Sequence, residues 1–255
     1  MAVIFCFSGT GNSLYAANQI AASIGAEVCN MRDPRTVGAV KDEVIGFVFP
    51  TYFWGLPKSV RKFIGRLQIE NKNAYIFAVT TYGGFSSGVC DAVNVLLKKQ
   101  EVKLSYSAKI KMVENYLPGF ECNDSDKVWA KSDEALDKII VDISGRKHVI
   151  TAPYTVLNGL SQKMYPSNKP CCAEKFFADG CVSCGLCEKI CPNGNIKLEN
   201  GVPTFGEKCD LCLACLNNCP ADAINYGETT VGKKRYKNPR ITTDELVKHN
   251  SSENK

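Results

Sequence analysis

Two copies of one cysteine spacing, CxxCxxCxxxCP, constrain this chain more than any other feature of its sequence. They contain eight of the 14 cysteines, which are Cys181, Cys184, Cys187 and Cys191 in the first copy and Cys209, Cys212, Cys215 and Cys219 in the second. The repeat continues beyond the cysteines, because Pro192 aligns with Pro220 and Ile196 with Ile224 at the same period of 28 residues. We therefore expect an internally duplicated unit whose two halves pack face to face.

This spacing is typical of cysteines that bind iron–sulfur clusters. Three close thiolates hold one 4Fe–4S cluster, and the fourth thiolate, before proline, ligates the other cluster. The stretch resembles the two-cluster bacterial ferredoxins, which are small α+β domains. The resemblance implies one cluster held by Cys181, Cys184, Cys187 and Cys219 and another held by Cys209, Cys212, Cys215 and Cys191.

Two other interpretations of the cysteines are weaker. Paired CxxC motifs also form zinc sites, but zinc is complete with four ligands and requires neither the third close cysteine nor the following proline. A disulfide framework is typical of secreted proteins, and we find no secretory signal. We expect Cys6, Cys29 and Cys90 to be small buried hydrophobic residues. Cys122, Cys171 and Cys172 are not needed as ligands, because eight thiolates already saturate two clusters.

The length of 255 residues suits two domains. We expect a flavodoxin-like domain at residues 1–150, a connector rich in Pro and Gly at 151–170, a ferredoxin domain at 171–230 and a basic tail at 231–255. The region 176–230 is acidic, with three lysines and seven Asp or Glu residues. The tail carries seven Lys or Arg residues, and we interpret it as a solvated tail or a strap over the acidic domain rather than a nucleic-acid site.

The N-terminal half shows the pattern of a parallel α/β domain. Short apolar runs at 2–7, 44–49 and 75–79 alternate with segments of helical spacing at 14–24, 60–67 and 89–96. A further strand is expected within 104–113 and a further helix within 127–143. Wholly apolar strands alternating with amphipathic helices predict a doubly wound, five-stranded parallel sheet covered on both faces.

Three loops that leave strand ends have the composition of a ligand site. Open parallel sheets bind ligands outside the carboxyl ends of their strands. The first loop, at 8–13, offers Gly, Ser, Thr and Asn at a helix N-terminus, as phosphate sites do, and looks like the phosphate loop of flavodoxins. It lacks the Lys of a Walker loop and is not a GxGxxG fingerprint. The loops at 50–57 and 80–85 mix aromatic residues with Gly and Pro, which suits the faces and edge of a flat isoalloxazine ring. The three loops together predict an FMN site.

With both halves considered, the chain resembles a family of flavodoxin–ferredoxin fusion proteins, sometimes called ferrodoxins, found in anaerobic bacteria. The resemblance covers nearly all of residues 1–230 and rests on segments 7–13, 52–57, 115–118 and the two cysteine runs. It implies that FMN is bound by Ser8, Gly9, Thr10, Gly11, Asn12, Ser13, Pro50, Thr51, Tyr52, Phe53, Trp54, Gly55, Leu56, Thr80, Thr81, Tyr82, Gly83 and Gly84. Asn115 and Tyr116 are expected near the flavin or the domain junction.

One departure from ordinary flavodoxins concerns charge. The loops expected around the ring contain no Asp or Glu, and Lys58 and Arg61 follow closely. Carboxylates near a flavin disfavour its anionic, fully reduced form. We therefore expect that form to be less destabilised here than in a typical flavodoxin.

These observations predict an electron-transfer protein or oxidoreductase. Electrons would pass between FMN and two 4Fe–4S clusters within one chain, linking a low-potential donor to an acceptor among unidentified redox partner proteins. The alternative is a flavin enzyme that reduces a small molecule at FMN with electrons from the clusters, and a redox sensor has little support. We assign no catalytic residue. No apolar run reaches the roughly 18 to 20 residues of a membrane span, and we expect a cytoplasmic protein.

Overall fold

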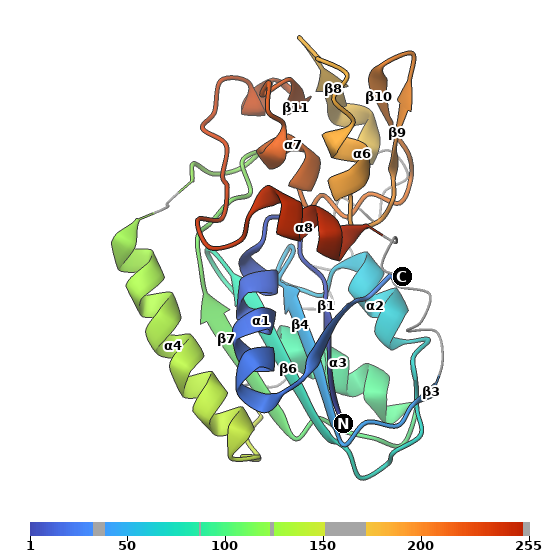
Figure 1. Cartoon of the computed structure of the whole chain (residues 1–255), viewed down its shortest axis with the longest axis vertical. Helices are drawn as coiled ribbons and strands as arrows, with labels where there is room; N and C mark the ends of the chain where they lie inside the picture. Colours follow the sequence, from blue (N-terminus) through green and yellow to red (C-terminus); the bar gives the residue numbers. More distant parts are fainter. Residues whose placement is uncertain (33–38, 87, 123–124, 151–171, 252–255) are drawn as a thin grey trace.

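The computed structural model describes residues 1–32, 39–86, 88–122, 125–150 and 172–251. The connector expected at 151–170 and Cys171 lie outside the described residues. Figure 1 shows a sheet with flanking helices at one end of the molecule and a smaller body of short strands and helices at the other, with helix α8 between them. No described helix is long and apolar enough to cross a membrane.

The larger body is built on a five-stranded sheet. Its strands are β1 (Ala2–Cys6), β2 (Glu27–Asn30), β4 (Val44–Pro50), β6 (Tyr75–Tyr82) and β7 (Tyr106–Lys111). They lie in the order β2-β1-β4-β6-β7, and every neighbouring pair is parallel. This is the flavodoxin-like order. Successive strands are added on one side of β1 up to β2 and on its other side from β4 onward, so the topological switch point lies between β1 and β4. The expected doubly wound parallel sheet is confirmed.

Two hydrophobic cores cover the two faces of this sheet. Helices α1 (Asn12–Ile24) and α4 (Asp126–Ser144) pack on the face that carries Ile4 and Val48. Helices α2 (Lys58–Ile64) and α3 (Val89–Lys98) pack on the face that carries Phe5 and Phe47. Successive residues of a strand point to opposite faces, so an apolar run buries residues in both cores. A further short parallel pair joins β3 (Ala39–Val40) to β5 (Gln68–Ile69).

The smaller body is α+β and repeats one unit, as its sequence predicts. Strand β8 (Phe176–Ala178) pairs antiparallel with β11 (Ile224–Tyr226), and β9 (Ile196–Glu199) pairs with β10 (Val202–Phe205). Helices α6 (Leu186–Ile190) and α7 (Ala214–Asn218) each begin one residue before the third cysteine of a CxxCxxC run, and they pack together. Two short 3-10 helices, η3 (Cys172–Lys175) and η4 (Glu228–Thr230), flank this unit.

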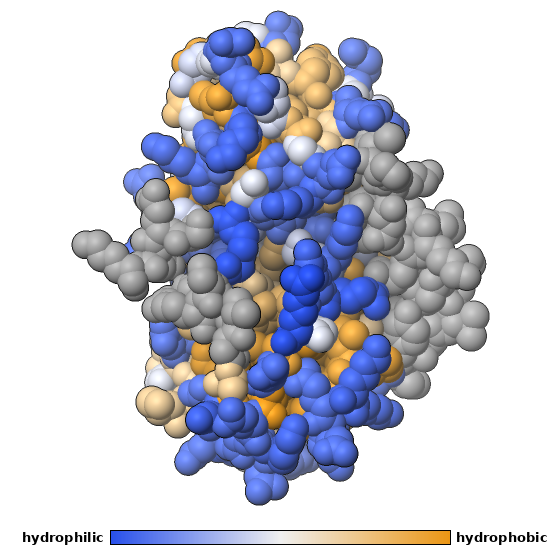
Figure 2. All heavy atoms as spheres, turned by 90° about the vertical axis from the view of Figure 1, so that its right-hand side faces the viewer, coloured by the Kyte–Doolittle hydropathy of each residue, from blue (hydrophilic) through white to orange (hydrophobic). Residues whose placement is uncertain are grey.

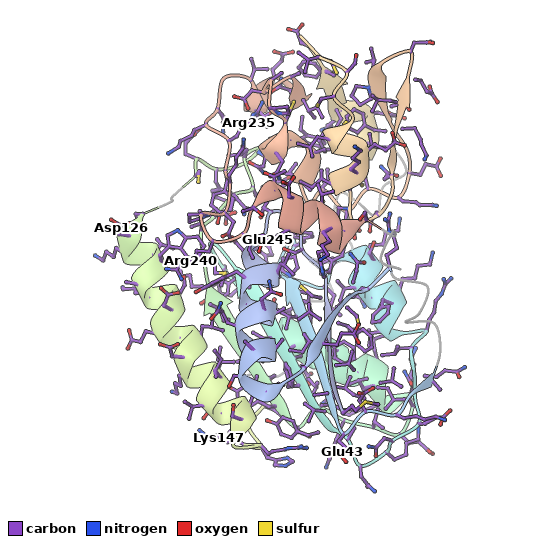
Figure 3. All side chains as sticks on the ribbon, in the orientation of Figure 1. Glu43, Asp126, Lys147, Arg235, Arg240 and Glu245 are labelled. Atoms are coloured by element: carbon purple, nitrogen blue, oxygen red, sulfur yellow. The ribbon has the colours of Figure 1, made fainter. Side chains whose placement is uncertain are left out.

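Residues 231–251, here called the strap, run from the smaller body across the larger one (Figure 1). Arg240 donates hydrogen bonds to both carboxylate oxygens of Asp133 on α4, and its guanidinium lies 4.8 Å from the ring centre of Trp129. Figure 3 shows Arg240 directed toward the upper end of α4. The strap ends in α8 (Thr243–Asn250), whose N-terminus carries a Thr242–Glu245 capping box. The segment expected as a basic tail thus packs against both bodies, since α8 contacts β2 of the sheet domain and α6 of the smaller body.

The face formed by the right-hand side of Figure 1 is largely hydrophilic where the structure describes it. Figure 2 shows hydrophilic residues over much of this face, with hydrophobic residues in separate patches between them. The apolar side chains are concentrated instead in the sheet cores and in a cluster that includes Phe176, Ile196 and Leu216.

Candidate functional site

The two ligand sets implied by the ferredoxin resemblance surround two separate small cavities. The outer set, which lines the first cavity, is Cys181, Cys184, Cys187 and Cys219. The inner set, which lines the second cavity, is Cys191, Cys209, Cys212 and Cys215. In each set three thiols come from one copy of the repeat and the fourth comes from the other copy. Among the described residues, no group of three or more His, Cys, Asp or Glu side chains is arranged to hold a single metal ion.

Backbone geometry in the cysteine loops directs amide groups toward sulfur. Ser183 and Leu211 occupy equivalent repeat positions, and both have left-handed backbones with φ of 58° and 51°. Their N–H groups lie 3.5 and 3.4 Å from the sulfurs of Cys181 and Cys209. A left-handed conformation costs a leucine about 1–2 kcal/mol. Hydrogen bonds to sulfur are among the features that set the potential of an iron–sulfur cluster.

Burial raises the pKa of some of these thiols and so favours their protonated form. It raises the pKa of the Cys187 thiol to about 11, and it raises the pKa of Cys215 well above the usual range, with Cys212 adding to the shift. Metal ligands must be deprotonated, so assembly of a cluster at these cysteines releases protons. Four thiols around one cavity, as in each of the two sets, suit an iron–sulfur cluster.

A cavity of about 580 Å³ opens at the carboxyl ends of the parallel strands. This volume is within the range of small-molecule sites. Of the residues expected to bind FMN, the structure brings 14 together around the cavity: Ser8, Gly9, Thr10, Asn12, Ser13, Pro50, Thr51, Tyr52, Phe53, Trp54, Thr81, Tyr82, Gly83 and Gly84. The three predicted loops therefore meet, because parallel strands deliver their carboxyl ends to one edge of the sheet.

Four residues expected in the site do not line the cavity. Gly11 has a φ of 97° and faces the strap, because a Cβ built on it would lie 2.9 Å from the Cβ of Asn238. Gly55 closes a hairpin with Tyr52 through backbone hydrogen bonds of 3.0 and 2.9 Å. Leu56 is wholly buried in the sheet core. Thr80 is also wholly buried, and its hydroxyl lies 2.8 Å from that of Thr51.

The loop at 8–13 is built to present backbone N–H groups. Helix α1 begins at Asn12, which lines the cavity, and its first turn contains no acidic residue that would offset the positive end of the helix dipole. The Ser8 hydroxyl accepts hydrogen bonds from the N–H groups of Gly11 and Leu14 and so fixes the turn. The Ser13 hydroxyl lies 2.8 Å from that of Thr81, which joins the first loop to the third. This is a suitable arrangement for a phosphate group.

Aromatic residues form one wall and the rim of the cavity. Phe53 and Trp54, at the tip of the Tyr52–Gly55 hairpin, both have positive φ, of 46° and 61°. Two consecutive large residues in this conformation are strained, which is typical of functional loops. The Trp54 side chain is half exposed and meets Phe85 edge to face at a centroid distance of 6.4 Å. These aromatic faces suit a planar ring system.

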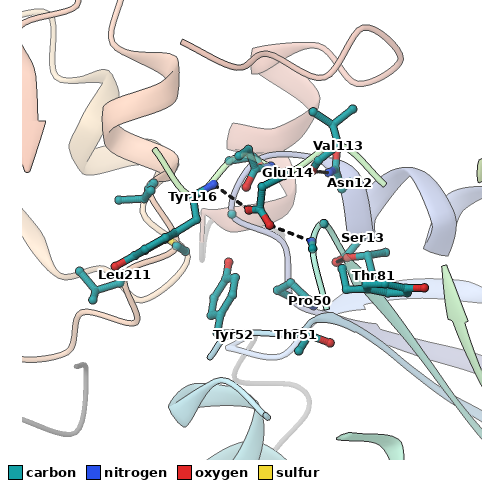
Figure 4. Close-up of a pocket in the computed structure, with 18 of the residues that line it drawn as sticks. Asn12, Ser13, Pro50, Thr51, Tyr52, Thr81, Val113, Glu114, Tyr116 and Leu211 are labelled. Atoms are coloured by element: carbon teal, nitrogen blue, oxygen red, sulfur yellow. Dashed lines mark hydrogen bonds between the residues drawn. The ribbon is translucent and has the colours of Figure 1, made fainter. Parts of the chain in front are cut away.

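Glu114 places a carboxylate in the cavity wall, which corrects the expectation of a site without acidic groups. It follows β7, and its two oxygens accept hydrogen bonds from the N–H groups of Gly84 (2.9 Å) and Tyr116 (3.1 Å), as Figure 4 shows. A Cβ on Gly83 would lie 2.5 Å from the Glu114 carboxylate, so this glycine permits the close approach. Glu114 lies outside the three loops expected from the sequence, because the fifth strand, β7, also ends at this edge of the sheet.

The inner cysteine loop closes the same cavity from the other body. Leu211, Cys212 and Leu213 line it beside the flavodoxin-type loops (Figure 4 labels Leu211). The buried Tyr52 hydroxyl is close to this loop: burial raises the pKa of Tyr52 well above its usual range, and the neighbouring Cys212 raises it further. Tyr52 therefore stays a neutral phenol. Val113, Asn115, Tyr116, Phe85 and Phe120 complete the lining.

Hydrogen bonds from α2 also join the two bodies next to the inner set. The Ser59 N–H donates to the carboxylate of Asp210 at 3.0 Å, and the Ser59 hydroxyl donates to the side-chain oxygen of Asn193 at 2.8 Å. Burial raises the pKa of Asp210, and these Ser59 and Asn193 contacts oppose the rise. The inner cysteine loop is thus held against the sheet domain by directed polar contacts.

Comparison with known proteins identifies the smaller body. Residues 180–224 match the family model described as the 4Fe-4S dicluster domain. The chain is 38% identical over 73 residues to the methylamine utilization ferredoxin-type protein MauM of Methylobacillus flagellatus, covering 24% of this chain and 31% of that protein. It is 44% identical over 46 residues to one component of the ion-translocating oxidoreductase complex of Methanosarcina acetivorans, covering 18% and 17% of the two chains. The chain thus spans less than a third of the length of either relative.

Solved structures of flavodoxins align with the larger body. The two-electron reduced flavodoxin of Megasphaera elsdenii is 18% identical, and the alignment covers 54% of this chain and 99% of that one with a TM-score of 0.31. The strand order β2-β1-β4-β6-β7 by itself establishes the flavodoxin-like topology. The chain therefore joins a flavodoxin-like α/β domain to a ferredoxin-type 4Fe–4S domain.

Proposed function

We propose that this protein transfers electrons between an FMN bound in the 580 Å³ cavity and two 4Fe–4S clusters, one held by each cysteine set. The observation that carries the proposal is the position of Cys212. This residue lines the cavity of the inner set and also the cavity proposed for FMN. One side chain is therefore shared by the two proposed redox sites.

The geometry favours a linear order of sites. The inner set lies against the proposed flavin cavity, and the outer set is joined to it through the packed helices α6 and α7. In the outer set Cys184 is exposed, and Val182 beside it is 63% exposed. Electrons would thus enter or leave at the outer set and at the flavin, with the inner set between them.

The chain's own residues hold and orient the cofactors. FMN supplies two-electron chemistry in single-electron steps, and each cluster supplies one electron. The N–H groups at the start of α1 and the hydroxyls of Thr10 and Ser13 would bind the FMN phosphate. The hairpin carrying Trp54 and the loop 81–84 would enclose the ring. Covalent linkage of the two domains keeps the sites at a high effective concentration.

Unidentified redox partner proteins would supply and accept the electrons. The matched relatives are called a ferredoxin-type protein and a component of an ion-translocating oxidoreductase complex, and these descriptions support a role in electron transfer. The domain boundaries expected from the sequence are part of the proposal: residues 1–150 would bind FMN, and residues 171–230 would hold the clusters.

Anaerobic reconstitution tests the proposal. The full chain is supplied with iron, sulfide and FMN, its iron, sulfide and flavin contents are measured, and it is titrated potentiometrically with visible and EPR detection. We expect one flavin and two clusters per chain. A protein that binds no flavin, or that binds zinc in place of iron, would contradict it.

Two cysteine variants test the order of the sites. Cys184→Ser is expected to disrupt the outer cluster and to leave the flavin absorbance spectrum unchanged, because Cys184 does not line the flavin cavity. Cys212→Ser is expected to disrupt the inner cluster and to shift the flavin spectrum. Both variants should retain about half of the iron. Equal effects of the two substitutions on the flavin would argue against the proposed order.

A second candidate function is reduction of a small molecule at FMN. Trp54, Phe85 and Phe120 line the cavity and are each more than half exposed, at 53%, 64% and 56%, so the cavity is open to solvent on this side. Steady-state turnover with small electron acceptors distinguishes this candidate from a carrier. An enzyme should show saturation with one acceptor class and loss of that turnover in Phe85→Ala, whereas a carrier should reduce many acceptors slowly and without saturation.

A further inference from the structure

A buried chain of hydrogen bonds links the proposed phosphate loop to the cluster domain through the strap. The Tyr236 hydroxyl donates to Asn12 Oδ1 at 2.6 Å, and the Tyr236 backbone N–H donates to Asn217 Oδ1 at 2.9 Å. Asn12 is the first residue of α1, and Asn217 lies on α7 between Cys215 and Cys219. One strap residue thus contacts the loop proposed for FMN and the helix that separates ligands of both clusters.

All three members of this chain are buried. Tyr236 is 2% exposed, Asn217 is 0% exposed and Asn12 is 8% exposed. A buried polar group that loses its partner incurs its full desolvation cost. These hydrogen bonds therefore favour one position of the strap relative to the start of α1 and to α7.

A second strap residue makes the same contact independently. Asn238 Nδ2 donates to Asn12 Oδ1 at 2.9 Å, so this oxygen accepts two hydrogen bonds from the strap. The Cβ of Asn238 also occupies the space that a side chain at Gly11 would need, at 2.9 Å from a built Cβ. Gly11 has a φ of 97° and precedes α1 directly, so the turn that aims the first N–H groups of α1 is packed against the strap. Both the helix start and the preceding turn depend on the strap.

We propose that Tyr236 is a positioning residue that couples the phosphate loop at Asn12 to helix α7 at Asn217, so that FMN binding and docking of the strap strengthen each other. The proposal rests on the proposed function, since it takes FMN as the ligand of the loop. Thermodynamic linkage makes the effect reciprocal: a strap that improves the affinity for FMN is itself stabilised by FMN to the same degree. Loss of FMN would loosen the strap and, through Asn217, the helix between the two cysteine sets.

Tyr236→Phe removes the hydroxyl and keeps the ring, so it tests the link directly. The FMN dissociation constant is measured by flavin fluorescence quenching on the anaerobic, deflavinated full chain with its clusters intact. We expect FMN to bind about five- to tenfold more weakly than in the unmodified protein, because Asn12 Oδ1 loses one of the two hydrogen bonds that it accepts. Asn238→Ala removes the other donor and is expected to weaken binding in the same direction.

Tyr75→Phe is the matched control. The Tyr75 hydroxyl donates to the Lys147 carbonyl at 2.8 Å, and Tyr75 is 5% exposed. Tyr75 is the first residue of β6, so it lies at the amino ends of the strands, opposite to the cavity. The substitution therefore removes one hydrogen bond of similar burial without touching the loop. We expect less than a twofold change in FMN affinity. Equal weakening by Tyr75→Phe and Tyr236→Phe would show a general effect of stability and would overturn the coupling.

Hydrogen exchange by mass spectrometry measures the reciprocal effect, which a merely structural role would not produce. Addition of FMN to the deflavinated protein is expected to slow exchange in peptides from 231–251 by a factor similar to the loss of affinity in Tyr236→Phe. In Tyr236→Phe itself this slowing should largely disappear. Exchange in the strap that is unaffected by FMN would overturn the inference. A wild-type chain that binds no FMN would instead overturn the proposed function, so the two failures are distinguishable.

Discussion

Gly9 and Cys212 approach so closely that no side chain fits between them. A Cβ built on Gly9 would lie 2.7 Å from the Cys212 carbonyl oxygen and 2.8 Å from its Cβ. Gly9 belongs to the proposed phosphate loop, and Cys212 belongs to the inner cysteine set. Because Gly9 has no side chain, the proposed flavin site and the proposed inner cluster site can lie in contact.

Gly9→Ala is expected to push the inner cysteine loop away from the sheet domain. The backbone oxygen it meets cannot rotate aside, so we expect a loss of about 1–3 kcal/mol in the free energy of unfolding, as for other overpacked sites. Electron transfer from reduced clusters to the flavin should slow, which stopped-flow absorbance of the flavin measures.

Gly145→Ala is the control for this substitution. Gly145 ends α4, its φ of −79° suits alanine, and a Cβ there meets its nearest neighbour, the Val141 carbonyl, at 3.4 Å. We expect its unfolding free energy to change by no more than about 0.5 kcal/mol and its electron transfer to be normal. A Gly9→Ala protein that behaves in the same way would show that the contact with Cys212 does not matter.

Glu114→Gln is expected to raise the midpoint potential of the second flavin reduction. The Glu114 carboxylate lines the proposed flavin cavity, and a negative charge there disfavours the anionic, fully reduced flavin. Glutamine keeps one carbonyl acceptor for the N–H groups of Gly84 and Tyr116, so the loop loses at most one of two hydrogen bonds.

A potentiometric titration of the flavin absorbance measures the effect of Glu114→Gln. Glu43→Gln is the matched control, since Glu43 is exposed at the end of the sheet far from the cavity (Figure 3). It should leave the potential unchanged. An unchanged potential in Glu114→Gln would mean that the carboxylate is too well screened to act on the flavin.

The sequence was sufficient to predict the sheet and the loops that meet at its edge. Strands β1, β4 and β6 are short apolar runs with the parallel-sheet pattern, whereas β2 has an exposed Glu27 and two half-buried residues and carries no such signal. The thiol groupings around the two small cavities follow from a repeat spacing that is visible in the sequence. As cluster ligands they remain a prediction.

The residues that meet at the junction between the domains could not be predicted from the sequence, because they depend on how the two bodies pack. Leu211 and Cys212 enter the main cavity through the way the two bodies pack, which no local pattern encodes. That packing depends on single polar side chains of the strap such as Tyr236 and Asn250. Asn250 donates to the backbone oxygens of both Ser8 and Ile190, at 3.0 and 3.1 Å. In the sequence, isolated polar residues of a basic segment cannot be distinguished from solvent-exposed ones, because their hydrogen-bond partners lie far away along the chain.

Arg32→Gln is expected to lower the midpoint potential of the inner cluster. The Arg32 guanidinium packs against Gly194 in the loop after Cys191, and burial lowers its pKa while Cys191 raises it. Its Nη2 donates to the Asn250 carbonyl at 2.9 Å, whereas its Nε has no hydrogen-bond partner among the described residues. Removing a positive charge beside a cluster makes electron uptake less favourable.

EPR-monitored titration would resolve the two proposed clusters and so tests the Arg32 prediction. The outer cluster should keep its potential in Arg32→Gln. Arg66→Gln, which changes an exposed arginine just after α2, should leave both potentials unchanged. A shift of both clusters by the same amount in Arg32→Gln would point to a loosened domain rather than to a local charge effect.

His249 makes the docking of the strap dependent on pH. The side chain is 8% exposed and its Nε2 lies 3.2 Å from the Cys6 carbonyl oxygen. Burial lowers the pKa of His249 to about 4, and the contact with Cys6 opposes this. In the unfolded chain the pKa is about 6.5, so between pH 6.5 and 4 the unfolded state binds a proton that the folded state does not. Stability is therefore full above pH 6.5 and falls as the pH drops toward 4.

Urea unfolding between pH 7.5 and 5.5 should show this loss, at about 1 kcal/mol over the interval. His249→Gln is expected to be less stable at pH 7.5 and to have a smaller pH dependence by about that amount. His148→Gln is the control, because His148 is exposed and its substitution should preserve the pH dependence. Asp133 does not interfere, since its hydrogen bond with Arg240 lowers its pKa and its stabilising effect is lost only below about pH 4. If His249→Gln kept the full pH dependence, another group would have to titrate in this range, and the buried histidine would not be the pH-sensitive contact of the strap.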